Sequence, residues 1–70
     1  MLLSDYNGCS VRVGDKLYCK DYPDWFMVIE RIGTFIIVVD RFFGDYFIGR
    51  FPIAVESIKG GKWIKTWRGL

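Results

Sequence analysis

Histidine is absent from this chain of 70 residues. Without it, the chain cannot form a histidine-based triad, and acid or base catalysis would need a carboxylate pair held in a pocket. The candidate pairs are Asp21 with Asp24 and Asp40 with Asp45. Both pairs lie in predicted turns, where aspartate is common because it bonds nearby backbone N–H groups. We therefore expect a protein that is not an enzyme.

Cysteine is scarce, and the glycines are not arranged to hold a phosphate. Cys9 and Cys19 are too few for a zinc site, which usually has four ligands, and no histidine completes the set. A bridge between them would need an oxidising compartment, so we expect two reduced thiols. The glycines follow neither the G-x-x-x-x-G-K nor the G-x-G-x-x-G spacing. We expect no metal and no cofactor.

Long apolar runs are also missing. No segment approaches the roughly 18–20 apolar residues of a membrane span. The apolar start at residues 1–3 is interrupted by Asp5 before any basic flank, unlike a signal peptide. We expect a cytoplasmic protein without a membrane partner. A chain this short has one core, so we expect a single domain at 1–70, with an arm at 1–10 and a tail at 68–70.

What the chain does have is aromatic and basic residues. Hydrophobic residues make up 51% and aromatic residues 19%, so a few large side chains can fill a small core. The net charge of +2 is too small to indicate an anionic partner by itself. The basic residues gather late, because residues 59–70 contain four of them and no acidic residue. Such a segment can contact an anionic partner or simply be a solvated face.

The apolar pattern predicts short β-strands. Residues 11–20 alternate, with Val11, Val13, Leu17 and Cys19 on one face, and Gly14-Asp15 marks a bend or bulge. A loop follows at residues 21–24.

The β-branched and aromatic run over residues 25–40 predicts a long hairpin that turns around Ile32-Gly33. A second turn at 42–45 leads to a strand at 46–51, which Pro52 should end because it has no N–H to donate. Residues 53–58 suit a single helical turn, and residues 62–67 suit a closing strand. The predicted fold class is all-β, with five strands and one helical turn before the last.

Two segments resemble SH3-like small barrels of the KOW and Tudor type. They are VRVGDKLYC at residues 11–19, similar to a V-x-V-G-D-x-V opening, and FPIAVESI at residues 51–58, similar to the turn before the final strand. Over residues 11–67 the resemblance implies a strongly bent antiparallel five-stranded barrel that binds peptides, histones, RNA or ribosomes. The chain lacks the A-L-Y-D-Y motif and the W-W pair, so we expect no proline-rich ligand.

The central hairpin has more apolar residues than one buried face needs. If Glu30 and Asp40 point outward, counting by twos gives their face the apolar residues Phe26, Val28, Ile36 and Val38. Two interpretations remain open: a bent strand that buries part of both faces, or an exposed patch for another protein or for a homodimer.

The last strand suggests an alternative site. If Ile64 points inward, the outer face carries aromatic rings among cations, a combination that single-strand nucleic-acid binders use. The residues of this alternative site are Lys62, Trp63, Lys65, Trp67 and Arg68. The tryptophans can equally cover the open end of a barrel.

A third candidate is an aromatic groove formed by Tyr22 and Trp25, with Tyr46 nearby and Asp21 and Asp24 at its rim. It would suit a peptide or a methylated cation. From these candidates we expect a non-catalytic protein-interaction module, an accessory or inhibitor protein. The alternative is a barrel that binds RNA or single-stranded DNA through its last strand.

Overall fold

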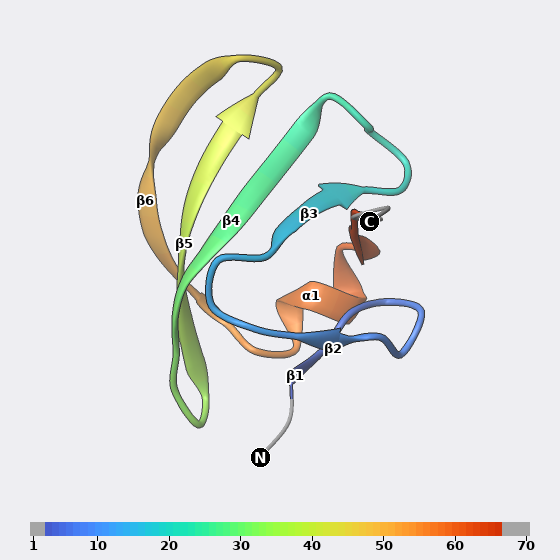
Figure 1. The fold of residues 1–70 in the computed structure, drawn as a ribbon, viewed down its shortest axis with the longest axis vertical. Helices are drawn as coiled ribbons and strands as arrows, with labels where there is room; N and C mark the ends of the chain where they lie inside the picture. Colours follow the sequence, from blue (N-terminus) through green and yellow to red (C-terminus); the bar gives the residue numbers. More distant parts are fainter. Residues whose placement is uncertain (1–2, 67–70) are drawn as a thin grey trace.

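The computed structural model describes residues 3–66 and has mostly β structure with one short helix (Figure 1). The elements are β1 (Leu3–Ser4), β2 (Ser10–Val11), β3 (Lys16–Cys19), β4 (Trp25–Ile32), β5 (Ile36–Phe43), β6 (Tyr46–Ala54), α1 (Ser57–Gly60) and β7 (Trp63–Lys65). An antiparallel five-stranded sheet has the order β6-β5-β4-β3-β7, and β1 pairs with β2 in a separate two-stranded sheet. The larger sheet is open, with β6 and β7 as its edges.

The predicted central hairpin is confirmed. β4 and β5 pair over almost their whole length, on either side of a turn at residues 33–35. The second predicted turn is also present but shorter, since Phe42 and Phe43 still belong to β5. Gly44 and Asp45 alone connect β5 to β6, and Gly44 has a φ of 56°, a value that glycine adopts without the steric cost other residues meet.

The core lies on one face of the large sheet, which we call the inner face. Alternate residues of the three central strands are fully buried there, as the period of two predicts. These residues are Leu17, Met27, Ile29, Ile37 and Val39. Ile58 of α1, Trp63 of β7 and the β1–β2 pair, through Leu3 and Val11, complete the same cluster. Burying each large aliphatic side chain contributes about 1.5–3 kcal/mol, so this cluster is the main source of stability.

Asp5 attaches the β1–β2 pair to β7. Its carboxylate is fully buried and accepts backbone N–H groups from Asn7 and Cys9 at 2.9 and 2.8 Å. The second oxygen accepts the N–H of Lys65 at 2.8 Å. The described part of the predicted N-terminal arm is therefore a strand pair packed against the core, held by a buried charge whose hydrogen bonds offset its desolvation.

The bend predicted at Gly14-Asp15 is present, but it divides residues 11–20 between two strands of different sheets, where one bent strand was expected. Val11 belongs to β2 in the small sheet, while Leu17 belongs to β3 in the large one, and Val13 is 61% exposed. The chain turns between them, because the Asp15 carboxylate accepts the backbone N–H of Arg12 at 2.9 Å. Such a local bond stabilises a turn in place of a strand.

The predicted break at Pro52 is also wrong, because β6 continues to Ala54 and Pro52 pairs with Val38. Val55 donates its N–H to Phe35 O at 2.9 Å, so these two residues form a hydrogen-bonded pair. Hydrogen-bonded and non-hydrogen-bonded pairs alternate along antiparallel strands. Pro52, three residues earlier, therefore belongs to a non-hydrogen-bonded pair, and its nitrogen faces the open edge. An edge strand tolerates proline in that position. The helix consequently starts later than predicted, at Ser57 instead of residue 53.

Both cysteines carry free thiols, and Cys19 donates a weak hydrogen bond to the carbonyl of Gly61 at 3.3 Å. Within residues 3–66, no cluster of three or more His, Cys, Asp or Glu side chains is placed to hold a metal ion. The same residues contain no helix with the length and apolar content that a membrane crossing requires.

Candidate partner-binding surface

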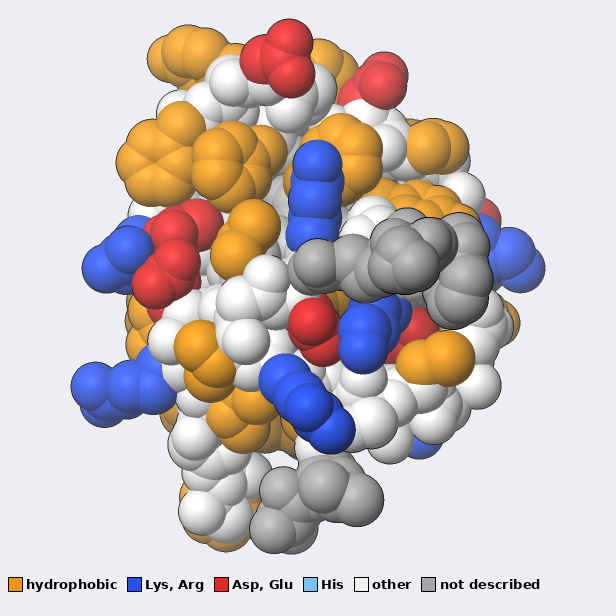
Figure 2. Space-filling view, in the orientation of Figure 1, with side chains coloured by type: hydrophobic (Ala, Val, Ile, Leu, Met, Phe, Trp, Pro, Cys, Tyr) orange, Lys and Arg blue, Asp and Glu red, His pale blue; other side chains and the backbone are white. Residues whose placement is uncertain are grey.

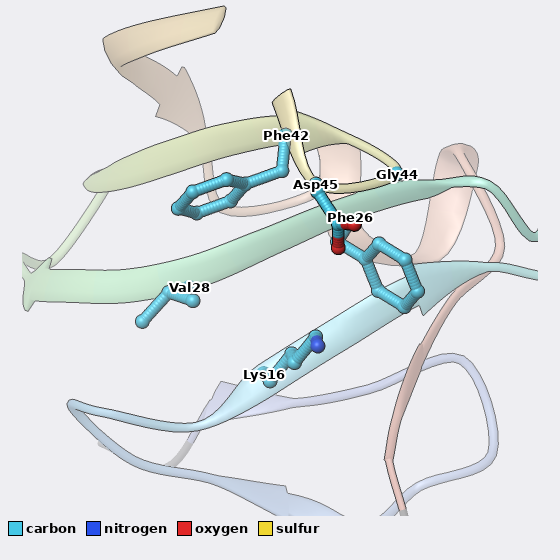
Figure 3. Close-up of a pocket in the computed structure, with 6 residues that line it drawn as sticks. All are labelled: Lys16, Phe26, Val28, Phe42, Gly44 and Asp45. Carbon is cyan, nitrogen blue, oxygen red and sulfur yellow. The ribbon is translucent and has the colours of Figure 1, made fainter. Parts of the chain in front are cut away.

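A hollow of about 250 Å³ opens on the outer face of the sheet, opposite the core (Figure 3). Cross-strand pairing builds it, since Lys16 of β3 lies opposite Val28 of β4, and Phe26 of β4 lies opposite Phe42 of β5. Opposite residues of neighbouring strands project to the same side, so these side chains meet above the sheet. The lining residues are Lys16, Phe26, Val28, Phe42, Gly44 and Asp45.

Lys16 gives this hollow a positive charge beside an aromatic ring. Its Nζ lies 4.3 Å from the centroid of the Phe26 ring. At this distance the ammonium is attracted to the ring face, and the interaction contributes about 0.5–1 kcal/mol at an exposed site. Asp45, from the turn between β5 and β6, supplies a carboxylate near the base of the Phe26 side chain in the view of Figure 3. The hollow therefore has apolar walls and charged groups at its margin.

Phe47 of β6 extends the apolar surface toward the open edge of the sheet. Its ring centroid lies 5.3 Å from that of Phe42, and Phe47 is 52% exposed. We call Phe26, Val28, Phe42 and Phe47 the aromatic patch. Figure 2 shows hydrophobic side chains gathered in the upper part of the molecule, over the upper ends of β4 to β6, with a basic side chain beside them. Exposed apolar groups that adjoin one another commonly mark interaction sites.

An ion cluster borders the aromatic patch on the outer face. Arg50 of β6 donates from Nε and Nη2 to the Asp40 carboxylate at 2.7 and 3.3 Å, and its Nη2 lies 3.5 Å from Glu30. The hydrogen bond from Arg50 lowers the pKa of Asp40, whereas the hydrogen bond with Asp40 raises the pKa of Glu30. Along β5, Asp40 separates Phe42 from Val38, so the cluster divides the outer face into an aromatic and an aliphatic part.

The predicted face assignment of the hairpin is confirmed. Phe26, Val28, Ile36 and Val38 occupy the outer face, because the residues between them are buried in the core. Their exposure differs, however. Ile36 is 50% exposed and the other three are half-buried, and the ion cluster separates the two pairs.

Trp25, which is predicted to form a groove with Tyr22, packs against neighbouring residues of the sheet. Within the described chain, the ring contacts of Trp25 are with Phe43, at 5.0 Å and 70°, and with Arg41. Trp25 pairs with Phe43 across β4 and β5 and projects to the inner side of the sheet. Tyr22 and Tyr46 are 67% and 71% exposed.

The predicted orientation of the last strand is wrong. Trp63 is 7% exposed and belongs to the core. The cause is the register of β7 on β3, where Lys65 lies opposite the fully buried Leu17 and Ile64 lies opposite Tyr18. Opposite residues of neighbouring strands share a face, so Trp63 points inward and Ile64 outward. The predicted assignment differs from this one by a single residue, which exchanges the two faces of the strand.

The lysines of this strand have acidic partners within the protein. Lys62 lies 3.3 Å from Asp21, whose hydrogen bond raises the pKa of the lysine. Lys65 lies 3.2 Å from Asp15 and donates to Ser10 O at 3.1 Å. The nucleic-acid alternative depended on a row of rings and cations on the outer face. Trp63 is buried and these lysines are paired, so they do not form such a row. Its other residues, Trp67 and Arg68, lie outside the described residues.

Sequence reasoning missed Lys16, Phe42 and Phe47 as members of the surface. Phe42 could have been found, since counting by twos from Asp40 reaches it. Phe47 could not have been found in this way. The register of β6 on β5 shifts between Arg41 and Phe42, and this bulge interrupts the alternation of faces along β6. No family model, curated protein or solved structure is significantly similar to this chain.

Proposed function

We propose that this chain is a small protein-interaction module with an SH3-like barrel architecture, and that it binds another protein through the aromatic patch. The order of the strands supports the architecture. A short helix precedes the last strand β7, as the SH3-like resemblance implies, and β7 lies beside β3. Such folds serve many binding functions, so the proposal depends on the surface and not on the fold.

The hollow on the outer face is the observation that carries the proposal. Its volume of about 250 Å³ is below the roughly 300–1,000 Å³ of most small-molecule sites, and it suits one inserted side chain. Aromatic residues, phenylalanine among them, are enriched in the buried centres of protein interfaces. The preferred partner segment carries an apolar side chain for the hollow and a hydrogen-bond acceptor for Lys16.

A pair of matched variants tests this proposal. Phe47→Ser removes an exposed ring of the aromatic patch, and Phe35→Ser removes a ring that is 78% exposed in the turn at the other end of β5. Immobilised wild-type and variant chains would be used to capture proteins from the source cells. Each captured protein would then be purified and titrated directly. We expect Phe47→Ser to weaken the affinity at least about tenfold, as interface aromatic residues often do, and Phe35→Ser to leave it unchanged.

Sedimentation velocity of the purified chain decides whether the partner is a second copy. A wild-type dimer that Phe47→Ser dissociates would identify a homodimer at the same surface. The proposal is wrong if both Phe47→Ser and Lys16→Ala keep their circular dichroism spectra and bind every partner as tightly as the wild type.

A further inference from the structure

Arg41 occupies an unusual position on the inner face of the sheet, beyond the core. It lies opposite Met27 of β4 and Gly49 of β6. Its Cζ is 5.5 Å from the ring centroid of Trp25 and 5.4 Å from that of Trp63. The guanidinium is therefore held by two tryptophan rings, an arrangement that favours a cation.

Within residues 3–66, Arg41 has fewer hydrogen-bond acceptors than its donors require. Its Nε is shut off from water and has no hydrogen-bond partner, and among residues 3–66 Arg41 forms no ion pair. A guanidinium has five N–H donors, and aromatic rings attract its charge without replacing oxygen acceptors. Arg50 shows the contrast, because it is more exposed yet binds two carboxylates on the outer face.

A hollow of about 230 Å³ is lined by Trp25, Arg41, Ile48 and Phe51. Gly49 shapes its wall. A Cβ added at Gly49 would lie 3.1 Å from Cζ of the Phe51 ring, so the absence of a side chain allows that ring to pack over the strand. The result is an apolar recess with a single cation and no acidic residue in its lining. We call it the Arg41 hollow.

We propose that the Arg41 hollow binds a monocarboxylate with a compact apolar body. The two oxygens of a carboxylate match the two terminal nitrogens of a guanidinium, and the apolar body would contact Ile48 and Phe51. A phosphate dianion is less suitable, because it needs more donors than one guanidinium supplies and the rest of the lining is apolar. The volume limits the body to about the size of one side chain.

This carboxylate chemistry has two sources, a free organic acid or an Asp or Glu side chain next to an apolar residue of a bound peptide. The hollow is on the opposite face from the aromatic patch. The inference is therefore independent of the proposed function, and either can fail without the other.

A titration of the ¹⁵N-labelled full chain tests the site, with benzoate as the probe and benzamide as its neutral isostere. The indole N–H signals of Trp25 and Trp63 and the Nε–H signal of Arg41 report on the hollow. We expect benzoate to shift them saturably and benzamide to bind at least about tenfold more weakly, because it lacks the charge-assisted bonds. Equal affinities, or no saturable shift with any probe, would overturn the proposal.

Two variants locate the binding. Arg41→Gln should reduce benzoate affinity at least about tenfold, since it removes the charge-assisted bonds, and Arg50→Gln, in the ion cluster of the outer face, should not. Unchanged benzoate affinity in Arg41→Gln would refute the site. The comparison of benzoate with benzamide uses only the wild type, so it decides the matter even if Arg41→Gln does not fold.

Further probes separate the sources. A blocked Val-Glu-Val peptide that shifts the same signals, when its Val-Gln-Val counterpart does not, assigns the site to a peptide carboxylate. A response to benzoate alone assigns it to a free acid. Tighter binding of phenyl phosphate than of benzoate would contradict a carboxylate site.

Discussion

The two faces of the five-stranded sheet are made by the same strands and are both rich in apolar residues, yet residues 3–66 cover only one of them. On the inner face, α1 and the β1–β2 pair pack against fully buried aliphatic residues. On the outer face, the neighbouring positions carry half-buried and exposed apolar residues and an ion cluster. Apolar alternation therefore identifies which residues share a face, but what covers that face depends on other segments of the chain.

The largest expected difference between the faces comes from two adjacent residues of β4. Ile29→Ala should destabilise the protein by about 3–4 kcal/mol, because it leaves a cavity in the core. Val28→Ala, on the outer face, should cost about 1 kcal/mol, because Val28 is only half-buried. Urea denaturation followed by circular dichroism measures both.

If Ile29→Ala does not fold, Ile29→Val gives the same comparison with an expected cost of about 0.5–1.5 kcal/mol. A cost for Val28→Ala equal to that of Ile29→Ala would mean that the outer face is also covered.

The second prediction concerns how the inner face is covered. Asp5→Asn replaces one carboxylate oxygen by an NH₂ group, which cannot accept the N–H of Lys65 or the N–H groups of Asn7 and Cys9. Leaving a buried donor without a partner costs about 1–3 kcal/mol, so the free energy of unfolding should fall by that amount. Thermal denaturation measures it, and Asp45→Asn, in an exposed turn, is the matched control. Equal melting temperatures for the two variants would contradict the anchoring role of Asp5.

The smallest effect is expected at the ion cluster of the outer face. The pKa of Asp40 is lowered, so this group stabilises the fold above its ordinary pKa of about 3.9, and the contribution is lost as the pH falls through the lowered value. The pKa of Glu30 is raised, so its contribution is present below its ordinary pKa of about 4.3 and is lost as the pH rises through the raised value.

The contributions of Asp40 and Glu30 therefore change in opposite directions with pH and offset each other in part. Carboxyl ¹³C NMR should show Asp40 titrating below Glu30, and Arg50→Gln should move the pKa of Asp40 upward. An unchanged Asp40 titration in that variant would show that Arg50 does not pair with it in solution.

The hairpin of β4 and β5 was predictable because its signals are local. β-Branched and aromatic residues favour strands, Gly33 favours a turn, and the side chains of a strand alternate. These rules are sufficient to place Phe26, Val28, Ile36 and Val38 on one face. They failed at Val13, which a local Asp15 bond takes out of the strand, and at Phe47, which follows a bulge.

The amino-acid sequence by itself determined a mostly β protein, its two tight turns and the residues that share each face of the long hairpin. Only the tertiary structure decided that Trp63 faces inward, that β6 continues past Pro52 and that the Arg41 guanidinium lies near two tryptophan rings. The reason is physical. Alternation and turn formation depend on neighbours in the chain, whereas register, edge position and ring contacts depend on pairing between segments far apart in the sequence.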